Sequence, residues 1–237
     1  MTIGKRRRLH VRVWCALALL CLLVALFPIQ TGITRSVVVF GSFGAWALGL
    51  FFFWRLLVCR VIFLLPIAGV VMLALMPYRI ADVPSLRAAY IQALRRYEGV
   101  RYLEGGEGWL GIDGSGLVRH GLIDASLSEG WRTKDLSLLR TGAALWWYDA
   151  SVKVIGEGYQ GRIRNITTTA SLNTLDETPI LPGDLAVTED GQHILAFLGE
   201  HTWIEADPKS GKVIVVSSPS KDPWFEMPLR IVRWYRL

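Results

Sequence analysis

The chain has 237 residues, of which 52% are hydrophobic, and a mean hydropathy of +0.36, which is too apolar for a purely water-soluble domain. Its net charge of +6 does not indicate nucleic-acid binding, because the basic excess is confined to the first 80 residues, which contain nine Lys and Arg and no Asp or Glu. The remaining residues carry 17 basic and 20 acidic side chains. Composition therefore predicts a membrane segment followed by a globular domain.

The first apolar run, Val11–Phe27, follows a basic cluster at Lys5–Arg8, a pattern typical of a signal peptide or a signal anchor. No small-residue cleavage site follows, because Phe27–Gln30 is bulky and polar. We therefore expect an uncleaved membrane helix over residues 11–28.

A second apolar stretch, Val37–Met76, is 40 residues long. As a single helix it would reach about 60 Å, roughly twice the hydrocarbon thickness of a bilayer. We expect it to turn at its only charges, Arg55 and Arg60, and to give membrane helices at 37–54 and 61–76. Residues 1–80 are thus predicted to form a three-helix membrane anchor.

Three crossings place the N-terminal basic cluster and the Arg55–Arg60 turn on one side of the membrane, and everything after Pro77 on the other. Because Lys and Arg accumulate in cytoplasmic loops, the globular domain is expected to be extracytoplasmic. The predicted location is the cytoplasmic membrane, with a multi-pass anchor and the lipid bilayer as partner. A two-helix hairpin with a cytoplasmic domain is the alternative.

The globular part begins with helical patterns. Apolar residues at helical spacing predict an amphipathic helix over Pro84–Tyr97, ended by Gly99. A glycine-rich loop then leads to a second predicted helix, Ser115–Leu127. Within Gly130–Pro179 we expect one helix around Leu136–Trp147.

From Ile180 onwards the pattern changes to short β-rich runs separated by turn signals. Helices followed by an antiparallel sheet indicate the α+β class. The predicted strands form a meander and a last strand that closes it: Asp184–Thr188, Ile194–Leu198, Thr202–Ala206, Val213–Ser217 and Leu229–Tyr235.

Three ordered blocks carry the most specific signal in the chain. The first is RYLEGG at 101–106 with GIDGSGLV at 111–118, the second is LPGDLAV at 181–187, and the third is HILAFLG at 193–199, followed by WIEAD at 203–207. These blocks resemble the NlpC family of papain-like cysteine peptidases, bacterial cell-wall endopeptidases whose signature includes Gly-x-Asp-Cys-Ser-Gly-Leu-Val. The resemblance implies a papain-like domain over 81–237, with a family-specific insertion at 130–179.

The resemblance places Gly114 at the position of the nucleophilic cysteine. A thiol there would lie at a helix N-terminus, where free N–H groups and the helix dipole lower its pKa. The three cysteines of the chain lie in the apolar runs, at positions 15, 21 and 59, so the globular part supplies no thiol. Ser115 would project about 100° away around the helix. As written, the chain is expected not to form an acyl-enzyme.

Three further positions match polar residues around the family's active site. His193 matches the histidine that acts as general base, and Glu205 matches the third residue, which orients that histidine, with His201 as a nearby competitor. Tyr102 matches the tyrosine whose hydroxyl helps bind a developing oxyanion.

Asp113 and Ser115 flank the nucleophile position and are assigned to substrate binding, with helix capping as the alternative for Asp113. The resemblance implies no metal and no cofactor.

Three functions remain open at this stage. The first is a membrane-anchored hydrolase of peptidoglycan stem peptides, inactive because of Gly114, which is either a natural pseudoenzyme or a variant whose cysteine was replaced. The second is a non-catalytic module that binds an envelope peptide. The third is a lipid amidase or acyltransferase of the same superfamily, acting at the membrane face.

Overall fold

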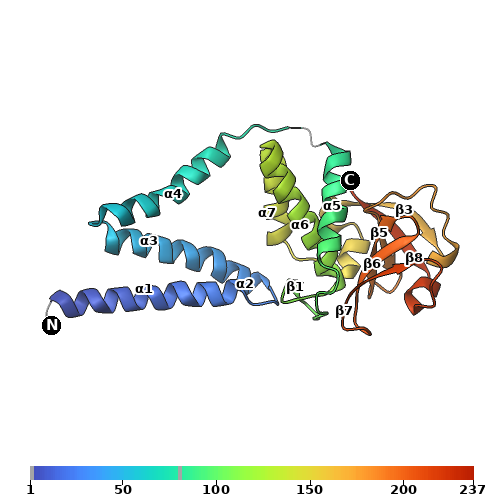
Figure 1. The fold of residues 1–237 in the computed structure, drawn as a ribbon, viewed down its shortest axis with the longest axis horizontal. Helices are drawn as coiled ribbons and strands as arrows, with labels where there is room; N and C mark the ends of the chain where they lie inside the picture. The colour runs from blue at the N-terminus through green and yellow to red at the C-terminus, as the bar shows by residue number, and fades with distance from the viewer. Residues whose placement is uncertain (1–2, 80–81) are drawn as a thin grey trace. The chain divides into compact units, whose positions relative to one another are not determined.

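A computed structural model describes residues 3–79 and 82–237 of the chain. It divides into two compact units, Met1–Pro77 and Tyr78–Leu237, which are described one at a time (Figure 1).

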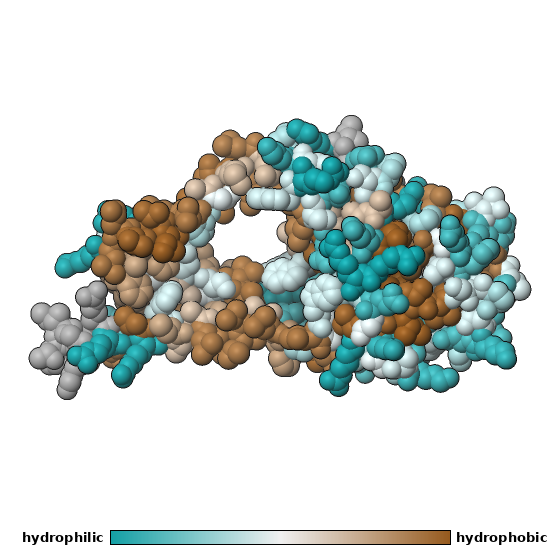
Figure 2. Space-filling model, in the orientation of Figure 1, coloured by the Kyte–Doolittle hydropathy of each residue, from teal (hydrophilic) through white to brown (hydrophobic). Residues whose placement is uncertain are grey.

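The first unit is helical. Three of its segments are long and apolar enough to cross a membrane, namely Arg8–Ala25, Gly32–Phe53 and Leu57–Ala74. Figure 2 shows hydrophobic side chains along these helices. The elements are α1 (Ile3–Ala25), α2 (Gly32–Ser36), the π-helical turn η1 (Val37–Gly41), α3 (Ser42–Phe53) and α4 (Leu57–Ala74).

Two boundaries of these helices lie earlier than predicted. The second helix begins at Gly32 because Thr31 and Thr34 form a capping box, in which the Thr34 N–H donates to Thr31 Oγ1 at 3.3 Å and the Thr31 N–H donates to Thr34 Oγ1 at 2.7 Å. Arg60 lies inside α4 and not in the turn. Its Nε and Nη2 donate to the Trp54 carbonyl oxygen at 3.2 and 3.0 Å, which satisfies a carbonyl group at the end of α3.

The second unit begins with α5 (Val83–Arg96) and the short ribbon β1 (Glu107–Gly108) and β2 (Gly111–Ile112). Three more helices follow, α6 (Gly114–Thr133), α7 (Leu136–Trp147) and α8 (Val152–Gly156), and then the 3-10 turn η2 (Tyr159–Gly161). The remaining elements are β3 (Ile163–Thr169), η3 (Leu172–Thr174), β4 (Leu185–Thr188), β5 (Ile194–Gly199), β6 (Thr202–Asp207), β7 (Lys212–Ser217), η4 (Pro223–Glu226) and β8 (Leu229–Trp234).

The six longer strands form one antiparallel sheet in the order β3-β8-β4-β5-β6-β7. Its two faces are buried by different elements. Alternate residues such as Ile194 and Ile204 pack with α5 and α6, whereas their neighbours Leu195 and Trp203 pack with Phe225 of η4. In Figure 1 the helices α5, α6 and α7 lie together beside the sheet. The domain is therefore α+β, as predicted.

The predicted helices at 84–97, 115–127 and 136–147 and all five predicted strands are confirmed. Sequence analysis did not find β3, which extends the sheet beside β8, or α8. Segment 130–179 is part of the folded core, because Leu138, Leu145 and Ile163 are buried in it. Its status as an insertion relative to the family stays a prediction.

Candidate active site

The loop before α6 is fastened to the first turn of that helix by Asp113. Asp113 Oδ1 accepts from the Gly116 N–H at 2.6 Å and the Ser115 hydroxyl at 2.9 Å, and Oδ2 accepts from the Gly105 N–H at 2.9 Å. Burial raises the pKa of the Asp113 carboxyl, and these hydrogen bonds oppose that shift. Asp113 is thus the N-cap of α6, and Ser115 is bonded to it. Their role in substrate binding stays a prediction.

Glycine at position 116 allows the loop to approach the helix closely. A Cβ atom there would lie 2.4 Å from the Gly106 carbonyl oxygen, a distance that no side chain tolerates. The sequence Gly-Ser-Gly at the start of α6 is therefore required in part for packing, independently of any chemistry.

Gly114 is the first residue of α6 and faces strand β5. A Cβ atom on Gly114 would lie 2.9 Å from Cγ2 of Ile194 and within 3.9 Å of the backbone nitrogen of the same residue. Because Ile194 directly follows His193, the helix N-terminus lies against the strand beside the histidine. A side chain at position 114 would require a small shift of the buried Ile194.

His193 is fixed by the β4–β5 hairpin and hydrogen-bonded to Glu205. Its N–H donates to Thr188 Oγ1 at 2.9 Å. Glu205 lies opposite Leu195 in the β5–β6 register, so the side chains of residues 193 and 205 are diagonal neighbours on one face. Nε2 of His193 and Oε2 of Glu205 form a hydrogen bond, and both residues are buried. The predicted contact between His193 and Glu205 is confirmed, whereas the reach of His193 to position 114 and the catalytic roles of both residues stay predictions.

The His193–Glu205 pair is incompletely satisfied. Burial raises the pKa of the Glu205 carboxyl, and the hydrogen bond from His193 opposes this shift. Oε1 of Glu205 is buried and has no hydrogen-bond partner among the described residues. The competitor His201 lies in a turn, where its Nδ1 and Glu177 Oε1 are 2.9 Å apart. It is not the partner of His193.

Trp224 covers one face of the His193 ring. The two ring centroids are 4.2 Å apart and the planes differ by 12°. Trp224 lies in η4, where its N–H donates to Asp222 Oδ1 at 3.1 Å and the Ser171 hydroxyl donates to the Phe225 carbonyl oxygen at 2.7 Å. Sequence analysis missed Trp224, although the preceding Asp222 and Pro223 are a helix-start signal.

Tyr102 lies beside the loop that leads into α6. Its backbone bridges Ile112, and its N–H donates to the Gly211 carbonyl oxygen at 2.8 Å. Burial raises the pKa of the Tyr102 hydroxyl, and the charges of Asp113 and Glu104 raise it further, so the hydroxyl remains a proton donor. Its role at an oxyanion stays a prediction.

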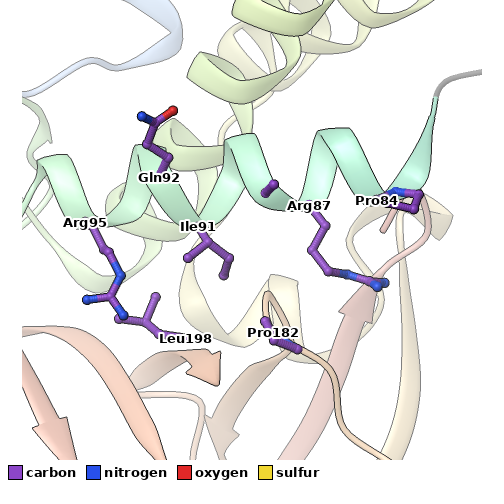
Figure 3. Close-up of a pocket in the computed structure, with 8 residues that line it drawn as sticks. Pro84, Arg87, Ile91, Gln92, Arg95, Pro182 and Leu198 are labelled. Carbon is purple, nitrogen blue, oxygen red and sulfur yellow. The ribbon is translucent and has the colours of Figure 1, made fainter. Parts of the chain in front are cut away.

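A groove elsewhere in the domain does not include these residues. It lies between α5 and the far end of β5 and is lined by Arg87, Ile91, Arg95, Pro182 and Leu198, with the two arginines on either side of Ile91 (Figure 3). Among the described residues, no group of three His, Cys, Asp or Glu side chains is arranged to hold a metal ion.

No family model and no curated protein matches the chain. Matches to solved structures include NlpC1 from Trichomonas vaginalis, with 18% identity over 67% of this chain and 46% of that one, at a TM-score of 0.43. They also include the NlpC/p60 domain of the peptidoglycan hydrolase SagA, with 21% identity over 62% and 97% of the two chains, at a TM-score of 0.33.

The peptidoglycan hydrolase RipB from Mycobacterium tuberculosis also matches, with 19% identity over 64% of this chain and 66% of that one, at a TM-score of 0.39. This chain thus spans about half the length of the Trichomonas protein and two thirds of RipB. This chain is thus similar in part to NlpC/P60 domains of known structure.

Proposed function

We propose that residues 78–237 form an NlpC-type domain that binds peptide stems of peptidoglycan and, with glycine at position 114, does not hydrolyse them. One observation carries the proposal. His193 and Glu205 form a buried hydrogen-bonded pair, and Gly114, the first residue of α6, has no side chain and lies against Ile194, the residue that follows His193.

This arrangement contains the parts of a thiol hydrolase except the thiol. Nε2 of His193 is bonded to Glu205, and Nδ1 has no hydrogen-bond partner in the described part of the chain, which leaves it available as a base. A cysteine at position 114 would lie at a helix N-terminus, which favours the thiolate. Without it, no covalent intermediate forms, and the N–H groups of α6 and the Tyr102 hydroxyl remain as groups that bind a peptide carbonyl.

We further propose that residues 1–77 anchor the domain in the cytoplasmic membrane with the domain outside. The candidate spans and the basic residues on one side of them support this topology. An extracytoplasmic domain would meet the cell wall directly. Labelling of a single cysteine introduced at Ser210 in intact cells tests the topology, and labelling that requires a permeabilised membrane would contradict it.

The decisive experiment is Gly114→Cys in the full chain, with Cys15, Cys21 and Cys59 replaced by Ala. We expect a thiol electrophile to label Gly114→Cys faster than a free thiol, because His193 can take its proton. The same variant with His193→Ala should label at the free-thiol rate. Incubation with purified peptidoglycan then tests the substrate, through release of stem-peptide fragments.

Gly114→Ala and Gly108→Ala are the matched controls. Both add only a Cβ atom, but a Cβ at Gly108 meets nothing within 4 Å, whereas one at Gly114 meets Ile194. They separate a folding defect from a chemical one. A folded Gly114→Cys protein that labels no faster than a free thiol would refute the active-site assignment. Fast, His193-dependent labelling without fragment release would support the site and refute peptidoglycan as its substrate.

A further inference from the structure

The globular unit begins close to the end of the last candidate membrane helix. Helix α4 ends at Ala74, and Tyr78 follows four residues later. An extended chain covers at most about 3.5 Å per residue, so Tyr78 lies within roughly 14 Å of the helix end. If α4 spans a bilayer, Tyr78 is therefore at or near the headgroup layer.

Contacts within the globular unit tie Tyr78 and its neighbour to the turn between α6 and α7. The Arg79 N–H donates to Asp135 Oδ1 at 3.2 Å, and the Ser137 hydroxyl donates to the Arg79 carbonyl oxygen at 3.4 Å. The Arg140 guanidinium donates to the Tyr78 hydroxyl. These contacts hold the turn between α6 and α7 beside Tyr78.

This end of the domain combines exposed aromatic and basic side chains. Tyr78 and Trp131 are 63% and 57% exposed. Of the acidic groups here, Asp135 is buried and hydrogen-bonded and Glu129 pairs with Arg132, whereas Asp82 is exposed and lies near Arg132. The same segments carry four exposed basic side chains, of which Arg140 contacts Tyr78 and Arg236 contacts Ser137: Arg79, Lys134, Arg140 and Arg236.

We propose that this α6–α7 turn face, defined by Tyr78, Arg79, Trp131, Lys134, Arg140 and Arg236, binds anionic phospholipid headgroups of the bilayer that holds the anchor. Tyr and Trp favour the membrane–water interface, and Lys and Arg are attracted to lipid phosphates there. The short connection to α4 selects lipid as the occupant, because it leaves little room for a protein between this face and the bilayer.

Lipid binding by this face orients the candidate active site. Gly114 is at one end of α6 and Trp131 is near the other, and at 1.5 Å per residue the two lie about 25 Å apart. Docking of the Trp131 end directs the Gly114 end away from the bilayer. This orientation favours a substrate in the cell wall over a membrane lipid, which separates two of the functions considered above.

The test uses the cysteine-free full chain in lipid nanodiscs, with a fluorophore at Lys134→Cys. The control label is at Ser210→Cys, in the β6–β7 turn, which lies at the opposite end of α5 from Asp82. With quencher-bearing lipids in phosphatidylglycerol discs, we expect quenching of the first label at least several-fold stronger than of the second. Quenching should weaken in phosphatidylcholine discs and at high salt.

Charge variants complete the test. Arg79→Gln with Arg236→Gln should reduce the quenching of the Lys134→Cys label, whereas Arg95→Gln with Arg96→Gln, at the other end of α5, should not. Equal quenching of the two labels, or quenching that is the same in both lipids, would overturn the proposal. None of these outcomes depends on the chemistry at Gly114, so this proposal and the proposed function can fail separately.

Discussion

Two buried carboxylates of the same sheet have opposite surroundings. Asp184, just before β4, accepts from Arg233 Nε at 2.6 Å, from Arg233 Nη2 at 2.7 Å and from the Leu181 N–H at 2.8 Å. Glu205 in β6 is equally buried, but it has one hydrogen bond, to His193, and its Oε1 has no partner within the described residues.

The difference separates a structural group from a candidate functional one. A buried carboxylate that satisfies both oxygens holds its elements together, and here it joins the loop before β4 to β8. A buried carboxylate left half-satisfied costs stability, and such groups are concentrated at functional sites. We therefore predict that Glu205 serves to orient His193 and adds little to folding stability.

The largest expected effect is on stability, from Asp184→Ala. The substitution leaves the buried Arg233 guanidinium without its counter-charge, which typically costs about 3–5 kcal/mol. Thermal unfolding of the full chain in detergent, followed by circular dichroism, measures it. The matched control is Asp176→Ala, whose carboxylate is exposed and bonds only to Thr178 in its own turn. Equal shifts for the two variants would contradict the assignment of Asp184 as a structural residue.

The second prediction concerns Glu205→Gln in the Gly114→Cys background. Glutamine keeps the size and one acceptor, so the unfolding free energy should change by less than about 1 kcal/mol. Loss of the negative charge weakens the hydrogen bond that orients the His193 ring, so electrophile labelling should slow on the order of 10²-fold. A variant that labels normally but unfolds at a much lower temperature would reverse the roles that we assign to Glu205 and Asp184.

Sequence reasoning succeeded where local signals decide the structure. Periodicity and turn residues predicted the helices and the meander, and the motif blocks predicted the His193–Glu205 contact across two strands. Sequence reasoning failed where packing between distant segments of the chain determines the structure. Trp224 of η4 stacks on His193, which lies 31 residues earlier in the chain, and β3 pairs with the edge of β8. No local pattern contains that information.

The close packing of Gly114 against Ile194 could not be predicted from the sequence. Motif matching treated the position as a vacancy left by a missing cysteine, whereas Ile194 lies close enough to restrict even a Cβ atom. Residue 114 would be glycine in the sequence both if close packing requires a glycine there and if a catalytic cysteine was replaced. The stability of Gly114→Ala compared with Gly108→Ala distinguishes the two cases, because only a Cβ atom at position 114 meets Ile194 of strand β5.

The smallest expected effect separates Glu205 from Asp207, its neighbour two positions along the same strand. Burial alone would raise the pKa of the Asp207 carboxyl, but hydrogen bonds from the Lys209 N–H at 2.9 Å and the Ser210 N–H at 2.7 Å lower it below the usual value. Because the pKa of Asp207 is lower in the folded state, its ionised carboxylate stabilises the fold at pH values above 3.8, the pKa of the unfolded state. This stabilisation is lost as the pH falls through the pKa of the folded state.

Glu205 should act with the opposite sign, because its raised pKa favours the folded state at low pH and this contribution is lost as pH rises through the folded value. Asp207→Ala should therefore cost about 1 kcal/mol at neutral pH, with the cost shrinking in acid. Glu205→Gln should lose stability relative to the unsubstituted chain as pH falls toward 4.5. Unfolding temperatures of the three proteins between neutral pH and pH of about 3 measure both trends, and parallel curves would mean that the two carboxylates share one environment.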